Sequence, residues 1–299
     1  MLRRTYRVNF GFVLEFGYIA LRVFLVNADK DIAYTRPVIR QAPPQDFDIN
    51  AVKVCINSDD RYSYTLERLL TAADKHDLNV YIGTYDPKDW WKSDYDDEYI
   101  STLADVTNAV FKAVTARYSS HRSMKGWYFT PEMYVNDKGY EDAWAKLLNL
   151  TISGIERYGN NLPMIFSPYC NDYSSGCQTA AESFTRLLRK VNFRPSDVFA
   201  PQDGFGALKK DVSAAELSKR YDFVKSCSEA AKSADVNFWL NCELFTNSAN
   251  EYASKNRMIG QFKLADVFCE KTICFSFAHY AFRPLDKTLF NDFKSILTN

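Results

Sequence analysis

The sequence predicts an α/β protein of the (β/α)8 TIM barrel class, because short apolar segments alternate with helical segments at a nearly constant spacing. Six apolar segments of strand length are continuous rather than alternating with polar residues, as expected of strands covered on both faces. They span residues 77–86, 124–133, 162–170, 196–204, 236–245 and 271–282. The residues between them carry apolar stripes at helical spacing, such as Leu103, Val106, Val110 and Val114.

The spacing of the strand ends supports this fold. The segments end at or near Tyr85, Glu132, Tyr169, Asp203, Glu243 and His279, which follow one another at intervals of 34 to 47 residues. One strand, one loop and one helix fill such an interval, and repeated βα units form a parallel sheet with right-handed crossovers. Eight units would nearly fill the 299 residues, which favours a closed barrel over an open doubly wound sheet. We expect one domain spanning residues 1–299.

The beginning of the barrel is expected to differ from this pattern. If the six segments are strands three to eight, "LRVFLVNAD" is strand two, and only about twenty residues remain for a first unit that usually needs about 30. We therefore predict an abbreviated or atypical first βα unit. Arginines before the apolar run hint at a secretory signal, but Glu15 and Arg22 interrupt it, so no convincing signal peptide is present. The same charges argue against a membrane span.

The composition narrows the function classes. The chain has 37 basic and 37 acidic residues, so no broad electrostatic field favours nucleic acid or an anionic membrane, and a neutral small molecule is the expected partner. The three histidines form no HxH or HExxH pattern, which argues against a metal site. "GFGALK" lacks the third glycine of a dinucleotide fingerprint, and the last two strand ends lack a glycine-rich phosphate turn. We expect no cofactor.

Two glutamates close apolar segments at positions that favour catalysis. Glu132 ends the fourth expected strand and Glu243 the seventh, and barrel enzymes carry their chemistry at the carboxyl ends of strands. Glycoside hydrolysis needs two such carboxylates flanking the scissile bond. One must remain ionised as nucleophile, while the other needs a raised pKa as proton donor.

Other polar and aromatic residues near the expected strand ends are candidates for binding a sugar. Each has a structural alternative: Asp-Gly favours a tight turn, amides anchor loops, and aromatic rings at strand ends often form the top layer of a core. Tryptophans in a charged loop can provide the flat apolar face on which a pyranose stacks, or can pack on a neighbouring loop. The candidates are Trp90, Trp91, Tyr128, Tyr169, Gln202, Asp203, Asn241 and His279.

Four motifs in order, "GWYFTPEM", "FSPYC", "FAPQDGFG" and "NCELF", resemble a bacterial barrel family of unknown function related to glycosyl hydrolases. The resemblance covers roughly residues 60–282, and it is compatible with a secreted or periplasmic location. Glutamates ending strands four and seven also resemble the largest clan of retaining glycoside hydrolases. That resemblance implies that Glu132 is the acid/base and Glu243 the nucleophile, acting on an oligo- or polysaccharide.

The chain departs from the clan pattern before Glu132. Most members have an asparagine there, whereas this chain has Pro131. Two alternatives to catalysis therefore stay open. One is a catalytically inactive carbohydrate-binding barrel, and the other is a structural barrel in which a basic neighbour neutralises Glu132 or Glu243. Nothing in the motifs specifies the sugar, the linkage, the compartment or the oligomeric state.

Overall fold

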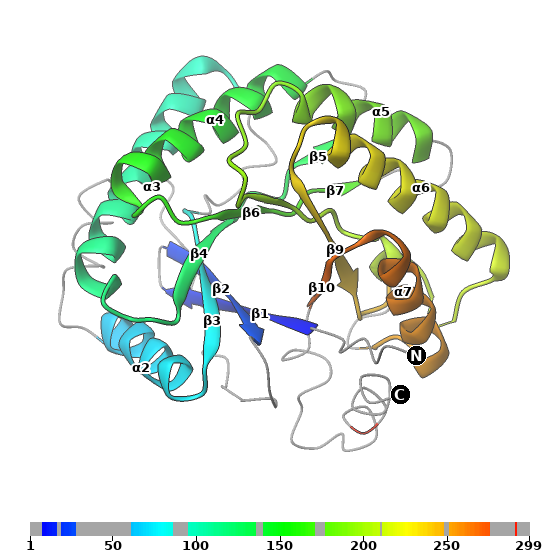
Figure 1. The fold of residues 1–299 in the computed structure, drawn as a ribbon, viewed down its shortest axis with the longest axis horizontal. Helices are drawn as coiled ribbons and strands as arrows, with labels where there is room; N and C mark the ends of the chain where they lie inside the picture. Colours follow the sequence, from blue (N-terminus) through cyan, green and yellow to red (C-terminus); the bar gives the residue numbers. More distant parts are fainter. Residues whose placement is uncertain are drawn as a thin grey trace.

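The structure of the chain is a computed structural model (Figure 1). It describes residues 8–16, 19–27, 61–85, 95–135, 140–170, 177–209, 211–247 and 251–275, together with residue 291. The helices are α2 (Arg61–Lys75), α3 (Asp97–Tyr118), α4 (Glu141–Tyr158), α5 (Cys177–Leu188), α6 (Ala214–Ser233) and α7 (Lys255–Phe268). They form an arc around the strands in chain order (Figure 1).

Six neighbouring strands of the central sheet run parallel in chain order. They are β3 (Leu78–Gly83), β4 (Met124–Phe129), β6 (Met164–Phe166), β8 (Val198–Phe199), β9 (Asn237–Glu243) and β10 (Lys271–Phe275). Each lies inside one of the six predicted apolar segments. The prediction of an α/β fold with parallel strands and intervening helices is confirmed.

The first two strands depart from repeated βα units at the place where the sequence predicts an abbreviated or atypical first unit. β1 (Val8–Phe16) and β2 (Ile19–Asn27) form an antiparallel hairpin. β1 pairs parallel with β10, while β2 pairs antiparallel with β3, and these pairings close the barrel. The predicted strand "LRVFLVNAD" therefore exists as β2 but runs opposite to the six parallel strands. A two-residue connection suffices for a hairpin, whereas a parallel pair needs a long crossover, so the short amino-terminal segment fits a hairpin.

Side chains on the parallel strands alternate between two apolar clusters. The inner cluster consists of Tyr81, Tyr128, Ile165, Val198, Ala200, Trp239 and Ile273. The neighbours of these residues along each strand, such as Trp127 and Phe129 on β4, belong to the larger cluster that also includes the helix faces. This alternation follows from the two-residue period of a strand in a closed barrel. Both faces of the sheet are therefore covered.

Capping residues define where three of the helices begin. The Asp96 side chain accepts a hydrogen bond from the Tyr99 N–H at the start of α3 (2.8 Å). Ser213 and Glu216 form a capping box at the start of α6. Ser254 accepts from the Arg257 N–H at the start of α7 (3.1 Å). These caps satisfy N–H groups that have no partner inside a helix, and the last one fixes the position of Arg257.

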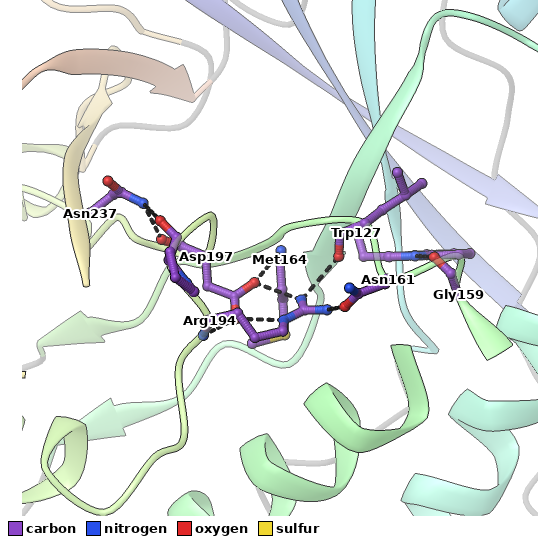
Figure 2. Close-up of polar contacts among 9 residues, drawn as sticks. Trp127, Gly159, Asn161, Met164, Arg194, Asp197 and Asn237 are labelled. Atoms are coloured by element: carbon purple, nitrogen blue, oxygen red, sulfur yellow. Dashed lines mark hydrogen bonds and ion pairs between the residues drawn. The ribbon is translucent and has the colours of Figure 1, made fainter. Parts of the chain in front are cut away.

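A buried ion pair joins the amino ends of three strands (Figure 2). Asp197 is fully buried just before β8, and its Oδ1 accepts hydrogen bonds from the Met164 N–H (2.8 Å) and from Arg194 Nη2 (2.6 Å). Arg194 also donates to Asn161 Oδ1 and to the Leu162 carbonyl (both 2.9 Å). Asn237, the first residue of β9, donates to the Asp197 carbonyl (2.8 Å). These contacts fix β6, β8 and β9 relative to one another at the end opposite to their carboxyl termini.

Asp197→Ala should lower the free energy of unfolding by about 3 kcal/mol, because it leaves the buried Met164 N–H and much of the Arg194 guanidinium without an acceptor. Chemical denaturation monitored by circular dichroism measures this change. Asp142→Ala is the matched control. Asp142 pairs with Lys190 across 2.5 Å, but its side chain is 84% exposed, so its loss should change stability by less than about 0.5 kcal/mol. Equal effects of the two substitutions would contradict the structural role of Asp197.

Candidate functional site

A polar layer lies above the inner apolar cluster, toward the carboxyl ends of the parallel strands. The Thr84 hydroxyl accepts from the Thr130 N–H (3.0 Å), and the Thr130 hydroxyl donates to the Thr84 carbonyl (2.7 Å), which joins the ends of β3 and β4. Asn241 Nδ2 donates to Ser167 Oγ (3.0 Å), which joins β9 to the segment after β6. All four side chains are buried. The barrel interior thus changes from apolar to neutral polar before the strands end.

Glu243 is the last residue of β9 and lies two residues beyond Asn241, so both side chains share the inner side of the barrel. Its side chain is buried, with 8% of the residue surface exposed, and Oε2 accepts a hydrogen bond from the Gly206 N–H (2.8 Å). Burial, together with the negative charge of Asp203, raises the pKa of Glu243 to about 8. Glu243 therefore carries a proton at neutral pH in the substrate-free protein.

The "QDGFG" loop between β8 and α6 is shaped to hold this carboxyl group. Asp203 Oδ1 accepts from the Phe205 N–H (3.1 Å), which forms an Asx turn. Gly204 has a φ of 71°, a left-handed conformation that favours glycine. A Cβ on Gly206 would lie 2.3 Å from the Phe245 ring, so only glycine allows this N–H to approach Glu243. The short helix η2 (Phe205–Ala207) follows directly.

Asp203 is fully buried beside Glu243 and accepts hydrogen bonds on both carboxylate oxygens. Oδ1 accepts from the Glu243 N–H (3.2 Å) as well as from the loop, and Oδ2 accepts from Gln261 Nε2 (2.6 Å). Burial raises the pKa of Asp203, while the hydrogen bonds and the Arg257 charge oppose that rise. Asp203 therefore forms the tight turn that Asp-Gly favours, and its charge also acts on Glu243.

Helix α7 supplies two buried polar residues behind Glu243 that the sequence analysis missed. Arg257 Nη2 donates to the Glu243 carbonyl (3.0 Å) and to the Phe245 carbonyl (2.5 Å), and Nη1 donates to the Lys209 carbonyl (2.8 Å). Gln261 Nε2 also donates to the Glu243 carbonyl (3.0 Å). α7 lies beside β9 and β10 (Figure 1). The two residues fix the end of β9 through its backbone carbonyl. In the described part of the chain, the Glu243 carboxyl group accepts its hydrogen bond from the Gly206 N–H instead of from Arg257.

Glu132 lies three residues beyond the end of β4 and is half-buried. The flanking backbone is fixed on both sides, because the Met133 N–H donates to the Pro131 carbonyl (2.9 Å) and the Met133 carbonyl accepts from the Tyr169 N–H (2.9 Å). The first contact closes a γ-turn around Glu132. The negative charge of Glu132 is among the causes that raise the pKa of Glu243. The charge of Glu132 thus acts on Glu243, the other carboxyl group predicted from the sequence.

The remaining sequence candidates lie in different environments. Tyr128 is 3% exposed and belongs to the inner apolar cluster. Tyr169 begins β7 (Tyr169–Cys170), which pairs with β5 (Tyr134–Val135) in a separate two-stranded sheet. Gln202 is half-buried and forms a parallel bridge with Asn241 beside Asp203. Trp90, Trp91 and His279 lie outside the described residues.

The sequence of α7 contained a weak signal for Arg257 and Gln261, the two site residues that the sequence did not predict. Arg257 and Gln261 are four positions apart in "NRMIGQF", so they share one helix face with apolar neighbours. A buried arginine and a buried glutamine on such a face require polar partners. The sequence did not identify those partners, since Asp203 and the Glu243 carbonyl come from other parts of the chain.

Within the described part of the chain, no cluster of three or more histidine, cysteine, aspartate or glutamate side chains is arranged to hold a metal ion. The helices of that part also include none long and apolar enough to span a bilayer.

Comparisons with solved structures place this fold among those of glycosidases. The chain superposes on a protein described as a "putative alpha-L-fucosidase" from Bacteroides thetaiotaomicron with a TM-score of 0.61 and 20% identity, over 82% of this chain and 75% of that one. A structure described as an endoglucanase gives a TM-score of 0.57 and 14% identity, over 87% and 82% of the two chains. At these identities the likeness describes the fold alone. No curated protein sequence matches this chain at a significant level.

The family comparison covers most of the sequence. Residues 40–288 match the family described as "Domain of unknown function (DUF4434)", a range that contains every described strand except β1 and β2. The chain therefore belongs to the DUF4434 family and has a glycosidase-like α/β fold.

Proposed function

We propose that this protein is a retaining glycoside hydrolase in which Glu243 is the nucleophile and Glu132 the acid/base. The observation that carries the proposal is that the negative charge of Glu132, just after β4, is among the causes that raise the pKa of Glu243 at the end of β9. A pair of interacting carboxyl groups at this place is the arrangement that glycoside hydrolysis needs.

The proposed reaction has two steps. Glu243 attacks the anomeric carbon while Glu132 gives its proton to the leaving oxygen, which forms a glycosyl ester on Glu243. Glu132 then removes a proton from water, the water oxygen attacks the anomeric carbon, and Glu243 leaves as a carboxylate. The Gly206 N–H binds Oε2 of Glu243, so we assign Oε1 as the attacking oxygen. The Gly206 contact also stabilises the carboxylate released in the second step.

The reaction needs one proton on the acid. In the substrate-free site, however, the proton is on Glu243, the residue that the resemblance assigns as the ionised nucleophile. A retaining pair needs one proton, carried by the acid at the moment of attack. In the substrate-free site that proton is on Glu243, because burial and the charge of Asp203 raise its pKa to about 8. The proton must therefore move from Glu243 to Glu132 before or during attack.

The catalytically inactive carbohydrate-binding barrel is the second candidate. Pro131 stands where most of the resembling clan has an asparagine, and the hairpin β1–β2 replaces the first parallel unit. This candidate predicts saccharide binding by the wild-type protein without turnover. Isothermal titration with oligosaccharides, combined with an assay of reducing ends, separates it from the hydrolase.

Glu243→Gln and Glu132→Gln should each lower kcat/KM on a chromogenic aryl glycoside by at least about 10³-fold, because each removes a group that acts in the transition state. A panel of aryl glycosides identifies the substrate to be used. Glu229→Gln, the same change on the exposed face of α6, is the control and should retain full activity.

The two roles are distinguished by adding azide to alanine variants. Glu243→Ala should yield a glycosyl azide of inverted anomeric configuration, and Glu132→Ala should yield one of retained configuration, because azide replaces the missing nucleophile or the missing base. Proton NMR of the products reads the configuration. The opposite pair of products would exchange the roles, and an inverted product from the wild-type enzyme would exclude the retaining mechanism.

The pH dependence of kcat/KM should show a decline above about pH 8. The active form needs one proton on the pair, and the pair loses that proton as the pH passes the pKa of Glu243. A rate that still rises between pH 8 and pH 9 would contradict the one-proton pair.

Glu243→Gln should stabilise the fold more at pH 8 than at pH 5. Because the folded-state pKa of Glu243 is raised from 4.5 to about 8, the folded protein holds a proton between these pH values that the unfolded chain has lost. Wild-type stability from this group is therefore fully present below about pH 4.5 and falls as the pH rises toward about 8. Thermal denaturation at both pH values measures the difference, with Glu229→Gln as control. An unchanged difference in Tm would mean that Glu243 titrates alike in both states.

A further inference from the structure

The hydrogen bonds around Asp203 fix which of the two buried acids is ionised. The orientation of the Gln261 amide is set by Arg257, whose Nε can only donate and does so to Gln261 Oε1 (3.3 Å). Gln261 Nε2 therefore faces Asp203 Oδ2, at 2.6 Å, and must act as the donor. Asp203 accepts in this contact.

The other contacts of Asp203 have the same polarity. The N–H groups of Phe205 (3.1 Å) and Glu243 (3.2 Å) both point at Oδ1, and a backbone N–H can only donate. The Cys242 thiol also hydrogen-bonds Asp203. A carboxyl group that accepts on both oxygens is stabilised as an anion, because a proton on either oxygen would displace a donor.

Glu243 has a different set of contacts. Among the described residues, its carboxyl group accepts one hydrogen bond, from Gly206, while Asp203 accepts three from nitrogen donors. Two carboxyl groups buried together do not both ionise readily, so the group with fewer donors takes the proton. Among the described residues, Glu132 after β4 and Arg257 on α7 are charged groups that act on these acids, and Asp203 in turn raises the pKa of the neighbouring thiols of Cys242 on β9 and Cys274 on β10.

We propose that Asp203 is a positioning residue: Gln261 and two backbone N–H groups hold it as an anion, and its charge places the mobile proton of the site on Glu243 in the substrate-free protein. This inference deepens the proposed function and depends on it only for the catalytic use of that proton. Asp203 does not touch substrate in this role. It sets the protonation of the residue that does, and Arg257 acts one contact further away by orienting Gln261.

The test is a titration that needs no substrate. In protein labelled with ¹³C at glutamate carboxyl carbons, the signal of Glu243 is identified by its absence from Glu243→Gln, and its chemical shift is followed from pH 4 to pH 10. The wild-type signal should titrate near pH 8. In Asp203→Asn the proton affinity of Glu243 should fall at least about tenfold, because the neighbouring negative charge is gone.

Two further variants keep the test decisive. Gln261→Leu removes the donor to Asp203 Oδ2 and should move the Glu243 titration in the same direction by a smaller amount, which serves as the test if Asp203→Asn does not fold. Asp211→Asn removes an exposed negative charge that acts on Arg257 and should leave the Glu243 signal unchanged, because solvent screens it.

Each outcome bears on the proposal. A lower Glu243 titration in Asp203→Asn or Gln261→Leu, with Asp211→Asn unchanged, supports the role of Asp203. A Glu243 signal that titrates as an ordinary glutamate in the wild type, or one that is unmoved in both variants, overturns it. If the shifts occur in a protein that hydrolyses no glycoside, the role of Asp203 stands and the hydrolase proposal fails, so the two failures are distinguishable.

Discussion

The burial of two carboxyl groups side by side is the constraint around which the carboxyl ends of β8 and β9 are arranged. Asp203 is fully buried and Glu243 nearly so, and in the described part of the chain neither accepts a hydrogen bond from a basic side chain. Isolated buried charges are costly, and a protein compensates with hydrogen bonds or by keeping a proton. This chain does both: the "QDGFG" loop and α7 supply the donors, and Glu243 keeps the proton. A purely structural barrel would have less reason to maintain such a pair.

The two ends of the barrel meet different physical demands. At the amino ends, Asp197 is paired with Arg194 and bonded to the backbone of β6, so its charge is satisfied within the network. At the carboxyl ends, Arg257 lies near Glu243 but donates to backbone carbonyls and to Gln261 Oε1. A guanidinium bound directly to Glu243 would ionise it permanently and block a proton transfer. The placement of Arg257 fixes the backbone while leaving the protonation of the carboxyl group adjustable.

The sequence predicted those features that depend on local pattern. Continuous apolar segments identified all six parallel strands, because strands buried on both faces cannot alternate with polar residues. The ends of the same segments predicted that Glu132 and Glu243 lie at the carboxyl ends of β4 and β9. It did not give the direction of β2, since an apolar run has the same pattern in either orientation. Arg257 and Gln261 were missed because their partners are brought to α7 only by the fold.

The protonation of Glu243 shows why a site cannot be completed from residue types alone. The resemblance to retaining enzymes assigns an ionised nucleophile to Glu243, yet the charge of that residue depends on how many donors face it and on the state of Asp203. Asp203 lies forty positions earlier in the chain, in a loop whose conformation requires Gly204 and Gly206. A substrate that brings its own hydroxyl donors toward Glu243 would offset the influence of Asp203 and favour ionisation of Glu243. Entry of the sugar and transfer of the proton to Glu132 would then be one coupled event, so that the nucleophile is generated only when there is a bond to cleave.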